Sequence, residues 1–422
     1  MKRSLLPVEH SVTADISLPG SKSMCNRALL LAALANGIST LNNMLFSDDV
    51  NSCIQALKDL GIDISVDLIK NSVTITGCSG GFPCKQAFLK MNDAGTLTRF
   101  LIPLCAAQRE GVYHFSGSTR MMERPILELM MILENLGARV EYLDSYGRMP
   151  FVLYSKGLNG GVVEVCGEKS SQFLSGLLLA APFARSSLKL ISTANHSQPY
   201  VLMTLSMMNL FGVQLKSCSG EYKVPRGGYF SIDHTIEPDI STASYFWAVA
   251  AITKGKVRVL NTTFDSLQGD ISFLSVLEEM GCKVSQTQQG ILLERKGDLN
   301  SVRVNMRDFS DTFMTVLSVA VFASGVTYIN GLTHTRLQES DRIEAMSKGL
   351  RKLGVNVKTT LDSIEVYPNG LHGNIVSGSN DHRIAMSLAL IGLKIPGVII
   401  DGAECVSKTC PDYFKRMSEI LA

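Results

Sequence analysis

Cationic side chains recur beside the small polar residues that open several apolar segments of this chain. Lys22 follows a Gly-Ser pair. Arg99 follows Thr96, and Arg383 follows Asp381. A helix N-terminus attracts anions through its unbonded N–H groups and partial positive charge. Ser, Thr and Asp are ordinary N-caps, but capping does not explain cations in the first turn, where they oppose the helix dipole. The pattern therefore predicts a site for phosphate or carboxylate groups.

A second cluster of charged residues lies near position 340. Glu339 and Arg342 are three residues apart, a spacing that favours an ion pair on one helix face. A carboxylate beside several cations is also a candidate acid or base. Both interpretations stay open at this point, with the ion pair favoured by the spacing.

The motifs of several common enzyme classes are absent from the sequence. Pro19-Gly20-Ser21-Lys22-Ser23 is similar to a P-loop but lacks the first glycine of that motif. There is no G-x-G-x-x-G, G-x-S-x-G or H-E-x-x-H, and the seven histidines are isolated. Dinucleotide-binding, nucleophile-elbow and zinc-protease chemistry are therefore not indicated.

The elements that would position these residues come from a repeat. A phrase of the form apolar-x-x-apolar-Gly, followed by an alternating strand pattern, recurs about every 70 residues, with glycines at Gly61, Gly137, Gly212, Gly281 and Gly354. Each phrase predicts an amphipathic helix that ends at a left-handed glycine. A sixth helix is expected over 413–421, at the C-terminus.

A second phrase repeats with the same period. It opens near Ser23, Thr96, Ser171, Thr242, Thr312 and Asp381 and continues into a segment that is apolar nearly all round, such as 28–34. A helix of this kind is buried on every side. The fold class is therefore α/β, with six units of about 70 residues, each holding one buried helix, one amphipathic helix and short strands.

Six such units exceed one compact core, because single cores stop growing near about 250–300 residues. The turn-rich segments 18–21 and 235–239 divide the chain into two lobes of three units. We expect a first lobe over 21–238 and a second lobe over 1–20 plus 239–422, with two chain crossings. A strand before Pro19 would complete the second lobe.

The composition excludes other classes of protein. Lys and Arg total 40 and Asp and Glu total 38, so the net charge of +2 argues against coating nucleic acid or an anionic membrane. The ten cysteines form no C-x-x-C pair, which favours reduced thiols in the cytosol. No signal-peptide core and no apolar run of about 18 residues is found, so a cytoplasmic protein is expected.

Taken together, the helix openings resemble the signature segments of the 3-phosphoshikimate 1-carboxyvinyltransferase family, also called 5-enolpyruvylshikimate-3-phosphate synthases. The resemblance runs along essentially the whole chain, in segments 18–37, 93–101, 120–126, 170–182, 337–343, 380–390 and 408–414. It implies a two-lobed enolpyruvyl-transferase fold with three units per lobe and the active site in the interlobe cleft.

The resemblance also implies a reaction. The enolpyruvyl group of phosphoenolpyruvate is transferred to the 5-hydroxyl of shikimate 3-phosphate, and phosphate is released, in the pathway to aromatic amino acids. The implied mechanism is addition and elimination without metal or organic cofactor. The expected partners are these two small molecules, and we expect a monomer.

Site residues follow from the family pattern, position by position. Asp311 would be the base for the 5-hydroxyl, and Lys22 and Glu339 would move protons at the methylene and the leaving phosphate. The residues implied to bind phosphoenolpyruvate are Lys22, Gly95, Arg124, Gln172, Arg342, Arg383 and Lys408. Those implied to bind shikimate 3-phosphate are Lys22, Ser23, Arg27, Ser170, Ser171, Gln172, Ser197, Asp311, His334 and Gln338, with Tyr200 near them.

Four positions depart from the common family pattern. Asp93 stands where Asn is usual, and as an ionised group it would repel the substrate, whereas as a helix cap it would be harmless. Gln338 replaces Lys, His334 replaces Asn, and Phe100 stands where some members have Pro.

Two alternatives compete with this assignment. UDP-N-acetylglucosamine enolpyruvyl transferases share the fold, but they carry Lys-Asn at positions 22–23 and a reactive-cysteine loop, and 116–122 here contains no cysteine. A non-catalytic relative that binds anionic metabolites is the other alternative, suggested by Asp93 and Gln338.

Overall fold

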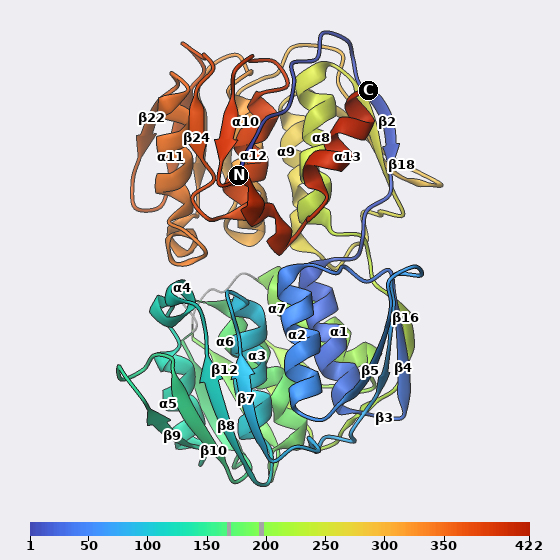
Figure 1. Cartoon of the computed structure of the whole chain (residues 1–422), viewed down its shortest axis with the longest axis vertical. Helices are drawn as coiled ribbons and strands as arrows, with labels where there is room; N and C mark the ends of the chain where they lie inside the picture. Colours follow the sequence, from blue (N-terminus) through green and yellow to red (C-terminus); the bar gives the residue numbers. More distant parts are fainter. Residues whose placement is uncertain (167–169, 194–197) are drawn as a thin grey trace. The chain divides into compact units, whose positions relative to one another are not determined.

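The computed structural model describes residues 1–166, 170–193 and 198–422. The chain forms two compact units (Figure 1). The first unit is Gly20–Ile236, and the second unit combines Met1–Pro19 with Glu237–Ala422. Each unit is described by itself below.

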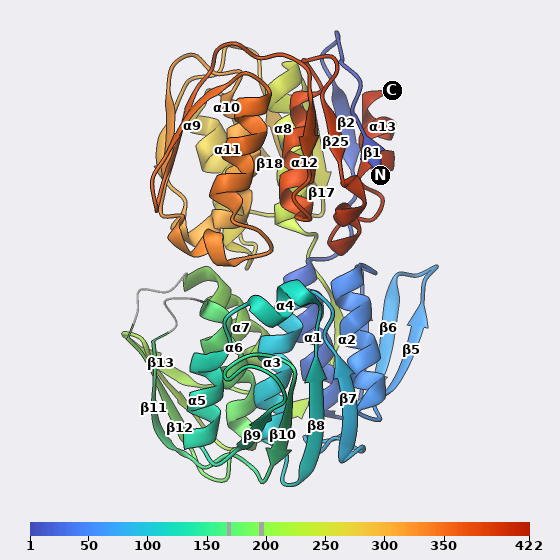
Figure 2. The same ribbon diagram turned by 60° about the vertical axis from the view of Figure 1, so that its left-hand side comes forward.

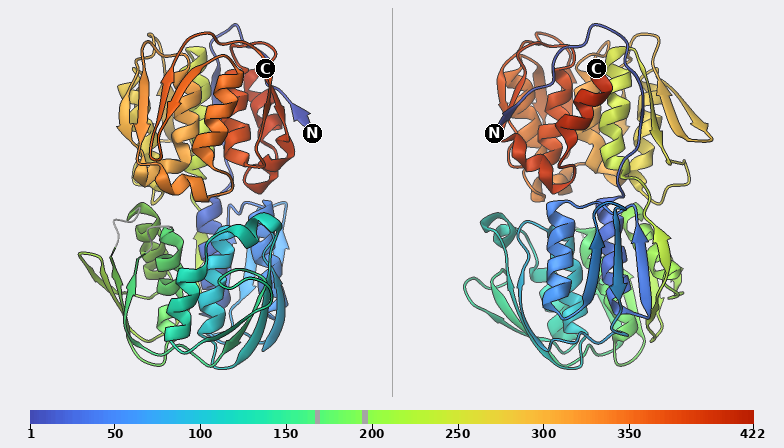
Figure 3. Two further views of the ribbon diagram at one scale, coloured as in Figure 1. Left: turned by 90° about the vertical axis from the view of Figure 1, so that its left-hand side faces the viewer. Right: turned by 45° about the vertical axis from the view of Figure 1, so that its right-hand side comes forward.

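Buried helices form the centre of each unit, as the second repeated phrase predicted. In the first unit they are α1 (Lys22–Leu34), α3 (Gly95–Ala106) and α6 (Ser171–Ala180). In the second unit they are α8 (Ile240–Thr253), α10 (Phe313–Ala320) and α12 (His382–Ile391). Every residue of α8 is buried. Figures 2 and 3 show sheets and further helices around these central helices in each unit.

The amphipathic helices also lie where the first phrase predicted them. They are α2 (Asp48–Asp59), α5 (Leu127–Asn135), α7 (Gln198–Leu210), α9 (Phe273–Glu279), α11 (Arg342–Lys352) and α13 (Tyr413–Leu421). The glycine after each of the first five has a positive φ, between 86° and 102°. This conformation strains side chains with a Cβ, so glycine ends these helices. The prediction of left-handed glycine caps is confirmed.

In the described part of the chain, three sheets of each unit follow one plan. In the first unit the strand orders are β16 (Asp233–Thr235), β4 (Ile38–Asn42), β6 (Ser72–Thr76), β5 (Asp63–Asp67); β7 (Gln86–Lys90), β8 (Gly111–Ser116), β10 (Phe151–Ser155), β9 (Arg139–Tyr142); and β11 (Gly161–Val165), β12 (Leu188–Ser192), β14 (Glu221–Val224), β13 (Lys216–Cys218). In each sheet the first pair is parallel and the other two pairs are antiparallel.

The second unit repeats this plan. Its strand orders are β2 (Thr13–Ile16), β17 (Lys256–Leu260), β19 (Gly290–Glu294), β18 (Lys283–Thr287); β20 (Arg303–Asn305), β21 (Thr327–Asn330), β23 (Ile364–Tyr367), β22 (Asn356–Thr359); and β24 (Ile375–Ser377), β25 (Ile399–Asp401), β1 (Lys2–Arg3). The last sheet lacks the fourth strand but keeps the parallel pair β24–β25 and the antiparallel pair β25–β1. A short parallel pair, β3 (Ala35–Asn36) with β15 (Tyr229–Phe230), adds to the first unit.

The first sheet of each unit is completed by a strand from a distant part of the sequence. β16 pairs in parallel with β4, with Asp233 opposite Thr40. β2 pairs in parallel with β17, with Ala14 opposite Val257. The strand predicted before Pro19 is thus present as β2, in the sheet that begins the second unit.

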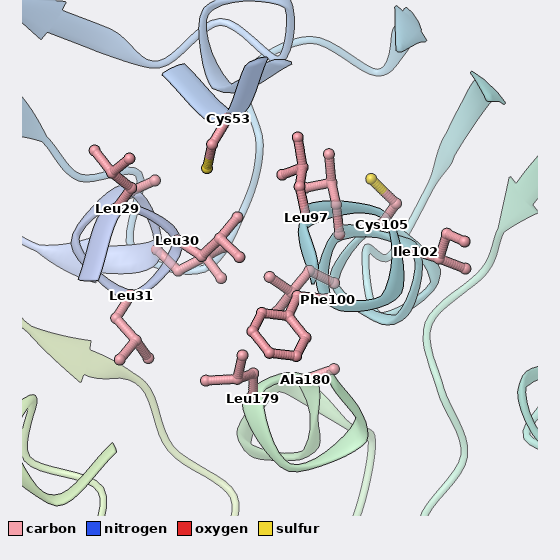
Figure 4. Packing of buried hydrophobic residues seen from close by; sticks show 14 of the residues in the cluster. Leu29, Leu30, Leu31, Cys53, Leu97, Phe100, Ile102, Cys105, Leu179 and Ala180 are labelled. Atoms are coloured by element: carbon pink, nitrogen blue, oxygen red, sulfur yellow. The ribbon is translucent and has the colours of Figure 1, made fainter. Parts of the chain in front are cut away.

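The core of the first unit lies between its central helices. Leu30 of α1, Phe100 of α3 and Leu179 of α6 are all buried and point toward one another (Figure 4). The second unit has its own cluster, which includes the single tryptophan, Trp247. Trp247 is fully buried and its Nε1 donates to the carbonyl oxygen of Ile291 at 3.2 Å.

The described part of the chain contains neither disulfides nor helices that could span a membrane. No disulfide joins any of the ten cysteines, all of which lie in the described part of the chain. Within that part, the helices are too short or too polar to cross a lipid bilayer.

Candidate active site

In the first unit, Lys22 is the first residue of α1 and lies largely inside the protein. Its Nζ is 3.1 Å from Oδ2 of Asp49, and the two side chains are only 10% and 5% exposed. Asp49 lies in the first turn of α2, where an acidic side chain is favourable for the helix dipole. This carboxylate places the Lys22 ammonium at the opening of α1, the position at which the sequence predicted an anion site.

Arg27 lies one turn further along α1 and is held by neighbours on two helices. Its Nε donates to Oγ1 of Thr204 at 2.8 Å, and its Nη2 donates to the carbonyl oxygen of Tyr200 at 3.2 Å. Its guanidinium also lies 4.8 Å from the centre of the Phe100 ring. Burial lowers the pKa of Arg27 to about 9, although the nearby Tyr200 opposes that shift. These contacts fix α1 against α3 and α7 at the predicted site.

Gly95, the first residue of α3, lies against the guanidinium of Arg124. A Cβ on Gly95 would be 2.5 Å from Nη1 of Arg124, well inside van der Waals contact. Arg99 fastens the same region, because it donates to the carbonyl oxygens of Gly95 at 3.1 Å and Pro125 at 3.2 Å. Two predicted phosphoenolpyruvate residues, Gly95 and Arg124, are therefore in contact.

Asp93 is not the helix cap that one interpretation of the sequence suggested. Ala94, and not Asp93, occupies the N-cap position of α3. Oδ1 of Asp93 instead accepts a short hydrogen bond from Oγ of Ser118, which itself caps the short helix α4 (Thr119–Glu123). Asp93 thus ties the opening of α3 to the segment that leads into Arg124.

The opening of α6 completes the first unit's share of predicted residues. Ser170 is its N-cap, and its Oγ accepts from the backbone N–H of Gln172 at 3.2 Å. The Gln172 side chain donates to Oγ1 of Thr96 on α3 at 3.1 Å. Ser171 is the first residue of α6, whereas Ser197 lies outside the described residues. The openings of α3 and α6 are therefore joined by side chains.

In the second unit, the carboxylate of Asp311 lies between two arginines. Nη1 of Arg342 donates to one oxygen of Asp311 at 2.8 Å, and Nη2 of Arg383 donates to the other at 2.8 Å. The three residues come from the 3-10 helix η3 (Arg307–Thr312), α11 and α12. Residues up to 72 positions apart thus meet around one carboxylate.

Arg342 binds three carboxylates at once. Besides Asp311, its Nε donates to Asp381 at 2.9 Å and its Nη2 donates to Glu339 at 2.9 Å. Its Nη1 also donates to the amide oxygen of Gln338. Burial by itself lowers the pKa of Arg342, but Asp381, Glu339 and Asp311 raise it above its usual value. The Arg342 side chain is only 2% exposed, but it keeps its positive charge because three carboxylates pair with it.

Glu339 bridges two cations. It pairs with Arg342 at 2.9 Å and with Nζ of Lys408 at 3.3 Å, and both Glu339 and Lys408 are mostly buried. The predicted ion pair is therefore confirmed, but its expected position on one helix face is wrong, because Glu339 lies in the bend before α11. The second interpretation, a role in proton transfer, is compatible with the same geometry.

His334 lies beside this cluster. Its Nε2 is 2.8 Å from Oγ of Ser310, the residue before Asp311. Burial lowers the pKa of His334, and Asp311 opposes that effect while Arg307 and Arg342 add to it. A neutral imidazole at this position can exchange hydrogen bonds with a hydroxyl or phosphate group but adds no charge.

The structure gives roles to several residues that the sequence did not assign to the site. Asp49 pairs with Lys22, and Asp381 pairs with Arg342 while its other oxygen caps α12. Ser241 contacts Arg383 at 3.3 Å. Asp49 and Asp381 both lie at the start of a helix. An aspartate in the first turn or at the N-cap is so common that the sequence alone does not mark it as a site residue.

Within the described ranges, no group of three or more His, Cys, Asp or Glu side chains is placed to hold a metal ion. What the described residues offer is clustered guanidinium and ammonium groups, of which Lys22, Arg342, Arg383 and Lys408 pair with carboxylates. Arginine forks match phosphate and carboxylate oxygens in geometry as well as charge. The arrangement can therefore bind small anions and place a carboxylate beside them.

Several known proteins similar to this chain carry one description. Residues 8–417 match the family model of EPSP synthase, 3-phosphoshikimate 1-carboxyvinyltransferase. The chain is 38% identical over 413 residues to the protein of that name from Nostoc punctiforme, covering 97% of both chains. It is 40% identical over 417 residues to the protein of that name from Tolumonas auensis, again covering 97% of both.

A solved structure provides the fold comparison. The EPSP synthase from Acinetobacter baumannii superimposes with a TM-score of 0.84, over 99% of this chain and 98% of that chain, at 25% sequence identity. This likeness confirms the predicted fold class, an α/β fold of the enolpyruvyl-transferase type.

Proposed function

Because the chain belongs to the EPSP synthase family, we infer that it transfers the enolpyruvyl group of phosphoenolpyruvate to the 5-hydroxyl of shikimate 3-phosphate, releasing inorganic phosphate. The observation that carries the site assignment is the carboxylate of Asp311, held at 2.8 Å by both Arg342 and Arg383. A base and two anion-binding forks are thereby combined in one cluster. The reaction is a step toward aromatic amino acids.

Anion binding is assigned to residues of both units. In the second unit, Arg342, Arg383 and Lys408 would bind phosphoenolpyruvate, which carries one phosphate and one carboxylate. In the first unit, Lys22, Gly95, Arg124 and Gln172 would bind the same substrate. The contact between Gly95 and Arg124 supports this grouping, because it leaves the guanidinium close to a backbone without a side chain. Placing the two anionic substrates together would lower the barrier by several kcal/mol, of the order of 7–11 kcal/mol at best.

Shikimate 3-phosphate is assigned to the openings of α1 and α6 and to the region of Asp311. The residues proposed to bind it are Lys22, Ser23, Arg27, Ser170, Ser171, Gln172, Ser197, Asp311, His334 and Gln338. The hydrogen bond between Gln172 and Thr96 supports a role for Gln172 in both substrate sites. Gln338, which replaces a common lysine, already accepts a hydrogen bond from Arg342 and would offer a neutral contact.

Proton movements follow from the chemistry of the reaction. As the 5-hydroxyl oxygen bonds to C2 of phosphoenolpyruvate, Asp311 takes the hydroxyl proton and the C3 methylene gains a proton, which gives a tetrahedral intermediate. In the second step a proton leaves C3, the C2–O bond to phosphate breaks and the enol ether forms. Lys22 and Glu339 are proposed to carry the protons at C3 and at the leaving phosphate.

We also propose that the protein acts in the cytoplasm as a monomer. The absence of disulfides among its ten cysteines supports a reducing compartment. Every residue assigned to the site comes from one chain, so no second copy is required. The near-zero net charge supports the absence of nucleic-acid or membrane partners.

The function is tested by measuring phosphate release from phosphoenolpyruvate with purified protein. Release is expected with shikimate 3-phosphate as acceptor and not with UDP-N-acetylglucosamine. Release only with the second acceptor would overturn the substrate assignment, and release with neither would favour a metabolite-binding protein. As a site control, Asp311→Asn keeps the size of the side chain and should lower turnover at least about 100-fold.

A further inference from the structure

A buried carboxyl group lies near the Asp311 cluster but belongs to none of the sites assigned above. Asp270 lies in the 3-10 helix η2 (Gly269–Ser272) and is 5% exposed. The preceding Gln268 fixes this helix, because its side chain accepts from the backbone N–H of Ile240 at 3.0 Å and donates to the carbonyl oxygen of Pro238 at 2.8 Å. Asp270 is therefore held rigidly against the start of α8.

The two oxygens of Asp270 differ in their surroundings. Oδ2 accepts a short hydrogen bond from Oγ of Ser241, in the first turn of α8. Oδ1 is buried and has no hydrogen-bond partner within the described residues. A buried carboxylate with an unsatisfied oxygen is costly, and protonation removes most of that cost.

Ser241 connects Asp270 to the cluster. A serine hydroxyl has one proton, which here goes to Asp270, and its lone pairs remain as acceptors. Nη2 of Arg383 donates to this hydroxyl at 3.3 Å and to Oδ2 of Asp311 at 2.8 Å. A continuous path of hydrogen bonds thus joins Asp270, Ser241, Arg383 and Asp311.

Charged groups face Asp270 from three other segments. Burial raises the pKa of Asp270 to about 7, the Asp311 carboxylate adds to that effect, and the Arg383 guanidinium opposes it. Asp239, the N-cap of α8, also raises it. Because this value lies in the neutral range, the charge near Arg383 changes over the pH at which enzymes are usually assayed.

We propose that Asp270 is a positioning residue that acts on Arg383 through Ser241 and, when ionised, weakens the hold of Arg383 on the anionic substrate. This rests on the proposed function, in which Arg383 binds phosphoenolpyruvate. A neutral Asp270 leaves the guanidinium charge for Asp311 and the substrate. An ionised Asp270 attracts the same guanidinium through Ser241 and repels the substrate's negative charges.

The test compares Asp270→Asn with the wild type at about pH 6 and about pH 8.5, on either side of the neutral range. The measurement is the KM for phosphoenolpyruvate at saturating shikimate 3-phosphate. We expect the ratio of variant KM to wild-type KM to be near one at the lower pH. At the higher pH it should fall to about one fifth, because the variant carries no charge there. Titration of the substrate's own phosphate cancels in this ratio.

Three further variants sharpen the test. Asp270→Ala also removes the charge, should show the same pH trend, and serves if the Asn variant does not fold. Ser241→Ala breaks the path, so its KM relative to the wild type should also be near one at the lower pH and should fall at the higher pH. Asp265→Asn, an exposed position on the same segment, is the matched control and should leave the KM unchanged.

Two results would overturn the proposal. One is a ratio for the Asp270 variants that is the same at both pH values, as expected if Asp270 only supports the fold. The other is a ratio of Ser241→Ala KM to wild-type KM that is the same at both pH values. If the wild type binds phosphoenolpyruvate but releases no phosphate with either acceptor, the proposed function fails separately. The same ratio is then measured as a Kd for phosphoenolpyruvate by calorimetry.

Discussion

The Asp270→Asn substitution should change how the stability of the second unit depends on pH. Burial raises the pKa of Asp270 in the folded protein to about 7, from an ordinary value of 3.8. Because the folded state binds this proton more tightly than the unfolded state does, the stabilisation is fully present below about pH 4. It is lost as the pH rises toward about 7 and changes little above that. Asparagine has no such titration.

The magnitude follows from the size of the shift. The range from about pH 5 to about pH 7 covers two pH units below the pKa of Asp270 in the folded protein. Over each of these units the unfolding free energy changes by about 1.4 kcal/mol. The wild type should therefore lose about 3 kcal/mol of unfolding free energy over this range that the variant does not lose. Other carboxylates titrate in both proteins, so the difference between variant and wild type isolates Asp270.

Urea unfolding followed by tryptophan fluorescence is the appropriate assay. Trp247 is the only tryptophan in the chain, it is fully buried, and it lies in the same unit as Asp270. A local reporter is needed because proteins with two compact units need not unfold in one step. The stability of Asp270→Asn relative to the wild type should rise by about 3 kcal/mol from about pH 5 to about pH 8. A relative stability that stays level within about 0.5 kcal/mol, as expected for the control Asp265→Asn, would refute the reasoning.

Two other substitutions test the contacts around the arginines. Gly95→Ala places a methyl group 2.5 Å from Nη1 of Arg124 and displaces the flexible end of that side chain. The KM for phosphoenolpyruvate should therefore rise about tenfold, while the free energy of urea unfolding changes by less than about 1 kcal/mol. An unchanged KM would remove Arg124 from the substrate site. Arg342→Lys leaves one ammonium group where a guanidinium paired with three carboxylates. The free energy of unfolding, followed at Trp247, should therefore fall by about 3–5 kcal/mol, and turnover should fall at least about 100-fold. Wild-type stability would show that Lys can replace the guanidinium.

The helices could be predicted because their signals are local. Glycine at the end of each amphipathic helix, and apolar residues on every face of the buried helices, are readable within about fifteen residues of sequence. The Glu339–Arg342 pair was predictable from its spacing, although Glu339 lies in the bend before α11 and not on that helix. The pairing of β2 with β17 was suggested only by the turn at Pro19, because its partners lie about 240 residues apart in the sequence.

Most of the site could not be derived from spacing. Asp311 and Asp381 both contact Arg342 only because η3, α11 and α12 are packed in one unit, and no local pattern encodes that packing. Ser197 was assigned by resemblance and stays a prediction. Asp270 was missed because an aspartate after Gln-Gly has the appearance of a turn residue, and its burial depends on contacts with α8.

The carboxylates change how the cationic cluster of the second unit should be understood. Arg342, Arg383 and Lys408 each contact a carboxylate, so this part of the protein is close to neutral although it is rich in cations. Under the proposed function, a phosphate or carboxylate that binds Arg342 and Arg383 must share them with Asp311. Their hold on Asp311 then weakens, and its oxygens become better proton acceptors when the substrate is in place. The pairing of Asp311 with Arg342 and Arg383 would thus keep the proposed base weak until the anionic substrate has bound.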